Sequence, residues 1–209
     1  AMAEVVRIYP KNPSEKGMRR IVECLEDGGI IIYPTDTVYS FGCDLLRKKS
    51  IEEVARIKGL KLKDADFSII FDDLSHLSDY TRPMESAVFK TLKRALPGAY
   101  TFILEANAAV PKLFGSNKKT IGIRIPDHSI PRLIVEQLGR PIIASSVHDE
   151  DEVIEYTTDP ELIAEKYGNK VDMIVDCGYG DNHASTVVDM SSGEPVIIRE
   201  GKGELSKVI

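Results

Sequence analysis

Three short polar side chains, Thr35, Asp36 and Thr37, directly follow an apolar, β-branched run at residues 30–32. The run predicts a buried strand, and Pro34 ends it because proline has no backbone N–H to donate. Open α/β sheets bind ligands beyond the carboxyl ends of their strands, so these hydroxyl and carboxylate groups stand where a ligand site is expected. A polar turn without a ligand explains the same residues equally well when they are taken alone.

Further segments of similar character follow along the chain. Residues 33–42 read Tyr-Pro-Thr-Asp-Thr-Val-Tyr-Ser-Phe-Gly, and the later segments are residues 57–59, 97–101, 120–126, 144–146, 185–189 and 198–201. With this ordered set the chain resembles the YrdC/YciO family, whose best known members are threonylcarbamoyl-AMP synthases that act in transfer-RNA modification. The resemblance covers nearly the whole chain. It implies a single α/β domain with a twisted, mixed open sheet, flanking helices and a concave ligand-binding face.

The resemblance also implies a nucleotide site. Family members join threonine, bicarbonate and ATP into threonylcarbamoyl-adenylate and release pyrophosphate, so negative charge builds on phosphate oxygens and cations stabilise it. Lys58 matches the lysine of the family's K-x-R element and would contact both the nucleotide and the substrate. Ser146 and Arg199 match the serine and arginine that contact the nucleotide. ATP is thus the expected substrate, and any Mg²⁺ would arrive with it.

For the amino acid, the resemblance points to Arg124, whose planar guanidinium suits a carboxylate. Thr120, Thr35 and Thr37 would lie close to it and contribute to substrate binding. The residues alone leave a second interpretation open, in which Arg124 is an ordinary surface arginine on an alternating strand. No residue is assigned as the catalytic group, although His148 could act as a general base or simply face solvent.

Some residues depart from the family pattern. Leu60 stands where the arginine of the K-x-R element belongs, and His148 replaces the asparagine of an S-x-N segment. The acidic residues 149–152 follow, and they predict either a loop turned away from the site or repulsion of a triphosphate. Together with Ser40 and Phe41, where the family commonly has Gly-Leu, these departures place the chain nearer the YciO branch than the synthases.

Composition limits the remaining choices. With 43% apolar residues in 209 and no Pro/Gly/Ser linker, one domain spanning residues 1–209 is predicted, and Ala1 before Met2 is interpreted as an expression remnant. An odd number of cysteines without C-x-x-C spacing argues against disulfides and zinc, and no dedicated metal site is expected. The apolar runs are strand-sized, so no membrane partner is predicted. A cytoplasmic protein fits all of these features.

A net charge of −6 argues against indiscriminate nucleic-acid binding, but one stretch is basic. Residues 47–63 contain two acidic residues and seven basic ones, which are Arg47, Lys48, Lys49, Arg56, Lys58, Lys61 and Lys63. The stretch is typical of a solvated helix face or of an RNA-binding surface. Two functions therefore stay open, an adenylate-forming enzyme and a module that binds double-stranded or transfer RNA with little or no adenylation.

The candidate site residues must be positioned by the predicted helices and strands. Apolar spacing predicts helices at residues 18–25, 85–95, 130–138 and 160–167, and Ser50 with Glu53 predicts a capping box at the start of another. Strands are predicted at residues 67–71, 100–104, 120–125, 141–145, 171–175, 186–189 and 196–199. Several of these strands are joined by short turns rather than by helices, which favours a mixed sheet over a doubly wound parallel one. His128 is expected to cap the helix that follows it.

Overall fold

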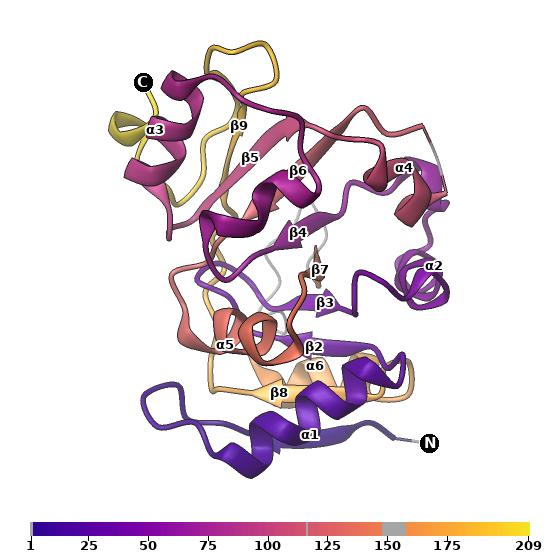
Figure 1. Cartoon of the computed structure of the whole chain (residues 1–209). Coiled ribbons are helices and arrows are strands. Elements are labelled where there is room, and N and C mark those ends of the chain that lie inside the picture. The colour runs from indigo at the N-terminus through magenta and orange to yellow at the C-terminus, as the bar shows by residue number, and fades with distance from the viewer. Residues whose placement is uncertain (1, 116, 148–157) are drawn as a thin grey trace.

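A computed structural model describes residues 2–115, 117–147 and 158–209. Its centre is a 10-stranded mixed sheet with the order β1-β8-β2-β3-β7-β4-β6-β5-β9-β10 (Figure 1). The strands are β1 (Glu4–Arg7), β2 (Ile31–Tyr33), β3 (Ser40–Gly42), β4 (Ser68–Ile70), β5 (Tyr100–Glu105), β6 (Thr120–Arg124), β7 (Ile142–Ser146), β8 (Met173–Asp176), β9 (Thr186–Asp189) and β10 (Val196–Arg199). The predicted α/β class and mixed sheet are confirmed.

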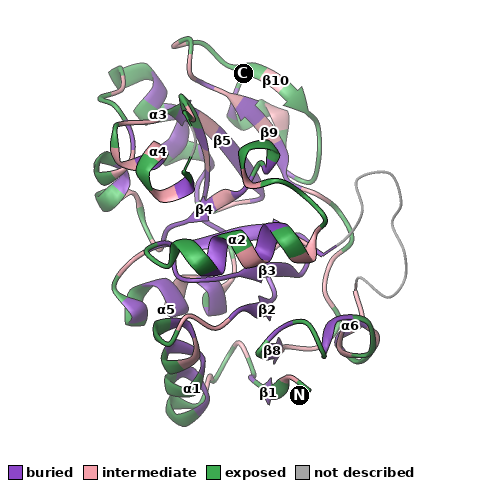
Figure 2. Cartoon of the chain, turned by 90° about the vertical axis from the view of Figure 1, so that its right-hand side faces the viewer, coloured by how far each residue is buried: buried purple, intermediate pink, exposed green. Residues whose placement is uncertain are grey.

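Helices cover both faces of the sheet (Figure 2). They are α1 (Glu15–Glu26), α2 (Lys48–Ile57), α3 (Ser86–Ala95), α4 (Ala109–Phe114), α5 (Ser129–Leu138) and α6 (Pro160–Tyr167), with short 3-10 turns η1 (Leu62–Asp64), η2 (Leu74–Asp79) and η4 (Leu205–Lys207). Helices α1 and α5 pack together on one face, over β2, β8 and part of β7. Helices α2, α3, α4 and α6 pack against the larger apolar cluster of the other face. None of the helices in the described ranges is long and apolar enough to cross a membrane.

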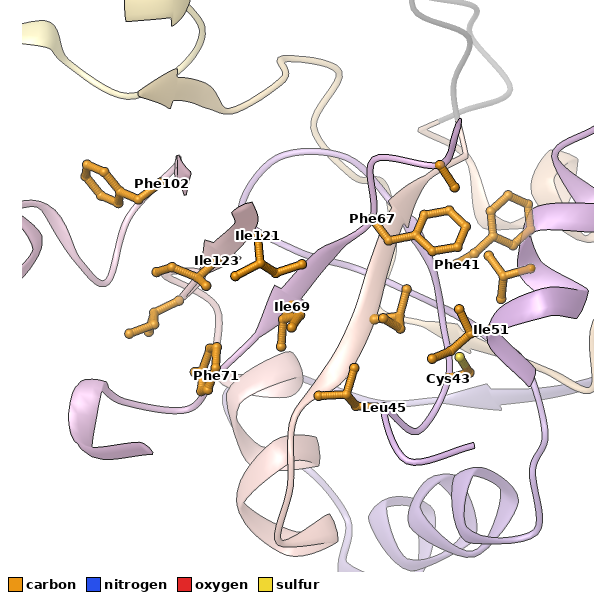
Figure 3. Close-up of a cluster of buried hydrophobic side chains, with 14 of the residues drawn as sticks. Phe41, Cys43, Leu45, Ile51, Phe67, Ile69, Phe71, Phe102, Ile121 and Ile123 are labelled. Atoms are coloured by element: carbon orange, nitrogen blue, oxygen red, sulfur yellow. The ribbon is translucent and has the colours of Figure 1, made fainter. Parts of the chain in front are cut away.

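The larger cluster is made by every second residue of the central strands (Figure 3). Ile69 of β4, Ile121 and Ile123 of β6, and Phe102 of β5 all point into it, and each is at most 3% exposed. Because successive side chains of a strand point to opposite faces, the residues between them must point the other way. Those intervening residues matter for the site described below.

The start of α2 differs from the prediction. The helix begins at Lys48, so Ser50 lies inside it rather than at its cap, and the predicted capping box is wrong. The Ser50 hydroxyl instead donates to the backbone oxygen of Gly28 at 2.7 Å, which ties α2 to the turn after α1. Glu53 pairs with Arg56 one turn later. Tertiary contact with the α1 turn therefore outweighs the local capping preference.

The short strand β3 was not predicted, and it requires a glycine. Gly42 of β3 pairs with Ile31 of β2, and the ring of Tyr33, two residues further along β2, lies against Gly42. The Tyr33 hydroxyl donates to the backbone oxygen of Ile143 at 3.0 Å. A Cβ at Gly42 would overlap the Tyr33 ring and stand 3.1 Å from the Ile143 oxygen. Both the ring and that oxygen are buried in the sheet, so neither can move aside easily.

We predict that Gly42→Ala lowers the free energy of unfolding by about 1–3 kcal/mol because the added methyl group overpacks the Tyr33 contact. Urea denaturation followed by circular dichroism measures the change. The matched control is Gly122→Ala, whose Cβ would meet the Thr101 methyl group at 3.0 Å, a side-chain tip that can shift. Equal losses in the two variants would contradict the packing argument.

Candidate functional site

One part of the sheet carries polar and small residues where apolar ones would be expected. In β6, Gly122 and Arg124 alternate with the apolar Ile121 and Ile123, and in β4 Ser68 precedes Ile69. The strand register places Ser68 opposite Gly122, and it places Ser40 opposite Ser146. We call this surface the polar sheet face; its residues are Ser40, Ser68, Thr101, Gly122, Arg124 and Ser146.

The same side of the sheet is apolar further along, where α1 and α5 cover Tyr33, Ile70 and Ile142. The polar sheet face begins where that cover ends. It crosses five neighbouring strands, from β3 to β5. At about 4.8 Å between strands this corresponds to about 19 Å, which is long enough for a nucleotide and an amino acid side by side.

The turn after β2 folds over this face and is held by its own hydroxyl groups. The Thr35 hydroxyl donates to the backbone oxygen of Val38 at 2.8 Å and accepts from the Thr37 backbone N–H at 3.0 Å. It also lies 3.0 Å from the Thr37 hydroxyl. Thr35 therefore shapes the turn, whereas Thr37 presents its hydroxyl toward β6.

Arg124 is the central side chain of the site. Its Nη2 donates to Asp36 Oδ1 at 3.0 Å and to the Thr37 hydroxyl at 3.1 Å. The two charged side chains are only 6% and 7% exposed, so the ion pair is buried. The interpretation of Arg124 as a surface arginine is therefore wrong. Its Nε is buried and has no acceptor among the described residues.

Asp36 is the residue of the candidate site that sequence reasoning underestimated. Besides the ion pair, its Oδ2 accepts from the Asp127 backbone N–H at 2.9 Å. The Lys202 ammonium donates to the Asp36 backbone oxygen and pairs with Asp181 at 2.8 Å. Burial opposes the ionisation of Asp181, but hydrogen bonds from Lys202 and His183 outweigh it and lower its pKa to about 2. Lys202, next to Gly201, was also missed because no local pattern links it to residue 36.

Lys58 and Ser146 come together as expected. Lys58 directly follows α2, and its Nζ donates to the backbone oxygen of Ser146 at 2.7 Å. Ser146 ends β7 opposite Ser40, so this ammonium group lies at one end of the polar sheet face. Leu60, two residues later, is 42% exposed and has no polar atom to offer a phosphate. His148 and the acidic residues 149–152 lie outside the described residues.

Thr120 does not lie beside Arg124, which corrects the expected grouping. It is exposed at the start of β6, whereas Arg124 is at the end of the same strand. Four residues of strand separate them by about 13 Å. The register of β4 with β6 and β7 instead places Thr120 at the end of the sheet where Ser146 lies. The grouping implied by the resemblance therefore does not hold for Thr120, because the extended strand carries it away from Arg124.

Arg199 joins the site through Ser185. Its Nε and Nη2 donate to the Ser185 backbone oxygen at 3.1 and 2.9 Å, and the Ser185 hydroxyl lies 2.8 Å from that of Thr101. A register shift between Ile197 and Arg199 in the edge strand β10 sets Arg199 opposite Val187. Arg199 is thus tied to the β5 end of the polar sheet face, far along the sheet from Lys58.

The site is defined by these contacts rather than by an enclosed cavity. A hollow of about 390 Å³ lies beside α5 and is lined by Asp72, Asp73, Ser129, Arg132, Leu133 and Glu136. It contains none of the expected ligand-binding residues, so the predicted concave ligand-binding face stays a prediction. Within the described ranges no cluster of three or more His, Cys, Asp or Glu side chains could hold a metal ion.

Comparison with known proteins gives consistent matches. A family model named for Sua5, YciO and YrdC, with the description "Telomere recombination", matches residues 23–201. The chain is 36% identical to YciO of Escherichia coli over 207 residues, which cover 98% of each chain. It is 29% identical to a threonylcarbamoyl-AMP synthase of Coxiella burnetii over 174 residues, which cover 83% of this chain and 92% of that one.

Two solved structures are similar over nearly the full chain. The crystal structure of E. coli YciO superimposes with a TM-score of 0.90 at 34% identity and covers both chains completely. Sua5 of Pyrococcus abyssi complexed with L-threonine superimposes with a TM-score of 0.84 at 25% identity, over 96% of this chain and 58% of that one.

His128 beside the site has the structural role expected from the sequence. Its Nδ1 accepts from the Ile130 backbone N–H at 3.1 Å and caps α5. Burial lowers its pKa, although Asp36 and Asp127 nearby oppose that effect. The capping nitrogen must be unprotonated to accept, so the folded protein holds the neutral ring.

We predict that the free energy of unfolding falls as the pH drops from about 6.5, where an unfolded-chain histidine titrates, through the lowered pKa of His128. In that window the unfolded chain binds a proton that the folded chain does not. His128→Asn keeps a capping acceptor without the titration, so its stability should decline less. Urea titrations of both proteins from pH 7.5 to 5 measure the difference, and parallel pH profiles would contradict this assignment.

Proposed function

The chain belongs to the Sua5/YciO/YrdC family, and we propose that it binds ATP and threonine and joins them with bicarbonate into threonylcarbamoyl-adenylate for transfer-RNA modification. The observation that carries this proposal is the buried Arg124, which stands beside Thr37 and has one N–H, at Nε, without an acceptor among the described residues. The name of the Coxiella relative and the threonine complex of Pyrococcus Sua5 support the choice of substrates.

This reaction requires positive charge near the phosphates more than it requires a nucleophilic side chain of the protein. The threonine amine combines with bicarbonate, with loss of water, to give a carbamate. A carbamate oxygen then attacks the α-phosphorus of ATP, the bond to the bridging oxygen breaks, and pyrophosphate leaves with Mg²⁺. Negative charge grows on the phosphate oxygens, where fixed cations are most effective.

The polar sheet face offers cations at both ends. Lys58 lies at the Ser146 end, and Arg199 lies at the Thr101 end through its contact with Ser185. We assign Lys58, Ser146 and Arg199 to the nucleotide in this proposal. The amino acid takes the middle, where a carboxylate can accept from Arg124. Thr120, near the Ser146 end, contacts the nucleotide side of the substrate rather than its carboxylate.

Leu60 limits how fast this reaction can be. An apolar side chain replaces the family arginine, and the neighbouring cation Lys61 is an exposed point charge rather than a bidentate fork. Removal of one donor from an oxyanion hole costs about 2.7–4 kcal/mol of transition-state stabilisation, and we expect a missing donor at a reacting phosphate to cost a similar amount. A slow synthase is therefore the expected form of this activity.

We predict pyrophosphate release that requires ATP, threonine and bicarbonate together, and a fall in kcat/KM of about 10²-fold or more in Lys58→Ala because a phosphate cation is lost. A coupled assay for pyrophosphate, repeated with each amino acid, measures both. Lys61→Ala removes the same charge from the following turn and should leave the rate unchanged. Release without any amino acid, or equal rates in both variants, would contradict the proposal.

RNA binding is a second candidate function, which one observation favours. The basic residues at the start of α2 are exposed, and the fold adds a further lysine to them. Lys118 donates to the backbone oxygen of Ala65 at 2.7 Å, so it lies beside the basic stretch of residues 47–63. A surface of lysine and arginine side chains can contact the phosphates of RNA. Such contacts suit double-stranded or transfer RNA, which proteins recognise largely by its shape and its phosphates. The surface would deliver the adenylate-forming site to its RNA, or serve binding alone.

We predict that changing Lys48, Lys49 and Lys61 to glutamate abolishes retention of transfer RNA in a gel-shift assay, because phosphate contacts and released counterions dominate such binding. Wild-type affinity should fall steeply with salt, and the thermal melt should barely change because all three side chains are exposed. Changing the exposed Lys11, Lys16 and Lys90 to glutamate gives the same net charge elsewhere and should preserve retention. Equal loss in both triple variants would instead indicate nonspecific attraction.

A further inference from the structure

We propose that Asp36 selects the ligand of this site by accepting the ammonium group of a zwitterionic α-amino acid whose carboxylate lies on Arg124. The inference rests on the proposed function, because it assumes that an amino acid binds at the polar sheet face. It adds a specificity-determining residue, and it names the feature that the ligand must have. A free ammonium group next to a carboxylate is required, and an acylated amine is rejected.

The charge of the site is the first argument. Arg124 and Asp36 form a pair that is neutral overall, and their side chains are only 6% and 7% exposed. Burying a further unpaired charge beside them would be costly, since little solvent is left to screen it. A simple carboxylate would bring one uncompensated negative charge. A zwitterion brings none, because its carboxylate faces the guanidinium and its ammonium faces the aspartate.

The second argument is the unused hydrogen-bonding capacity of the pair. Arg124 has five N–H donors, and its buried Nε has no acceptor among the described residues. A carboxylate can accept about four hydrogen bonds, whereas each oxygen of Asp36 accepts only one from the described residues, from Arg124 and from the Asp127 backbone. The site can therefore take one more acceptor at the arginine and one more donor at the aspartate.

The third argument is spacing and rigidity. The Arg124 Nη2 and the Asp36 Oδ1 are 3.0 Å apart, so the two charged groups are adjacent. In an α-amino acid the carboxylate and the ammonium are attached to the same carbon, which matches this adjacency. Asp36 is also held from two sides, through its Oδ2 by the Asp127 backbone and through its own backbone oxygen by Lys202. A preorganised acceptor discriminates better because little ordering is left for the ligand to drive.

The test is calorimetric titration with L-threonine and with N-acetyl-L-threonine, which keeps the carboxylate and the side chain but lacks the ammonium group. Wild-type protein should prefer threonine by about tenfold or more, the usual worth of a hydrogen bond to a charged group. In Asp36→Asn the preference should reverse. Threonine loses its anionic partner, and Arg124, now uncompensated, attracts the net anion N-acetylthreonine more strongly.

If Asp36 had only a structural role, Asp36→Asn would lower the affinity for both ligands together. A reversed preference therefore distinguishes ligand selection by Asp36 from a purely structural role. Asp66→Asn is the matched control, because it removes the same charge from an exposed side chain two residues before Ser68, and it should keep the wild-type preference. The wild-type comparison stands even if Asp36→Asn does not fold. Equal wild-type affinity for both ligands overturns this inference and leaves the proposed function intact, whereas wild-type protein that binds no amino acid overturns the proposed function.

Discussion

The buried ion pair between Arg124 and Asp36 is the interaction on which the rest of the site depends. It joins the end of β6 to the turn after β2, two segments 88 residues apart in the chain. Within the described residues Thr35 bonds inside the turn, and the ties from the turn to the rest of the protein run through Arg124, the Asp127 backbone and Lys202. A buried arginine in turn needs a carboxylate, since an unpaired charge at that depth is prohibitive.

The face of the sheet that carries the ion pair is divided into an apolar part and a polar part. Helices α1 and α5 cover one part, and over the other part the chain places small or hydroxyl-bearing residues such as Ser68 and Gly122. A Cβ at Gly122 would stand 3.0 Å from the Thr101 methyl group. The glycine therefore leaves no side chain projecting from the sheet at this position. The opposite side of the same strands is fully packed with Ile69, Ile121 and other apolar residues. The larger apolar cluster and the candidate site thus lie on opposite faces of these strands.

Much of this arrangement can be predicted from the sequence, and the exceptions have physical reasons. Alternating strands, helix spacing and the motif at Thr35 and Thr37 are local patterns, and the mixed α/β sheet follows from them. The partnership of Asp36 with Arg124 is not local, so no pattern of spacing could reveal it. Thr120 was misplaced because its four-residue distance from Arg124 spans a whole extended strand. Ser50 was wrongly predicted to cap its own helix. Its hydroxyl instead bonds to the Gly28 carbonyl, which lies in the turn after α1 and is 22 residues away in the chain.

The irregular pairing of β10 has a consequence for how this molecule meets its neighbours. Among the described residues β10 is an outer strand of the sheet, and it carries exposed Val196 and Ile198, a combination that would invite an added strand from another copy. The shift of register before Arg199 interrupts the even spacing that such a strand would need. The distortion that accompanies the contact of Arg199 with Ser185 would therefore also hinder edge-to-edge growth of the sheet.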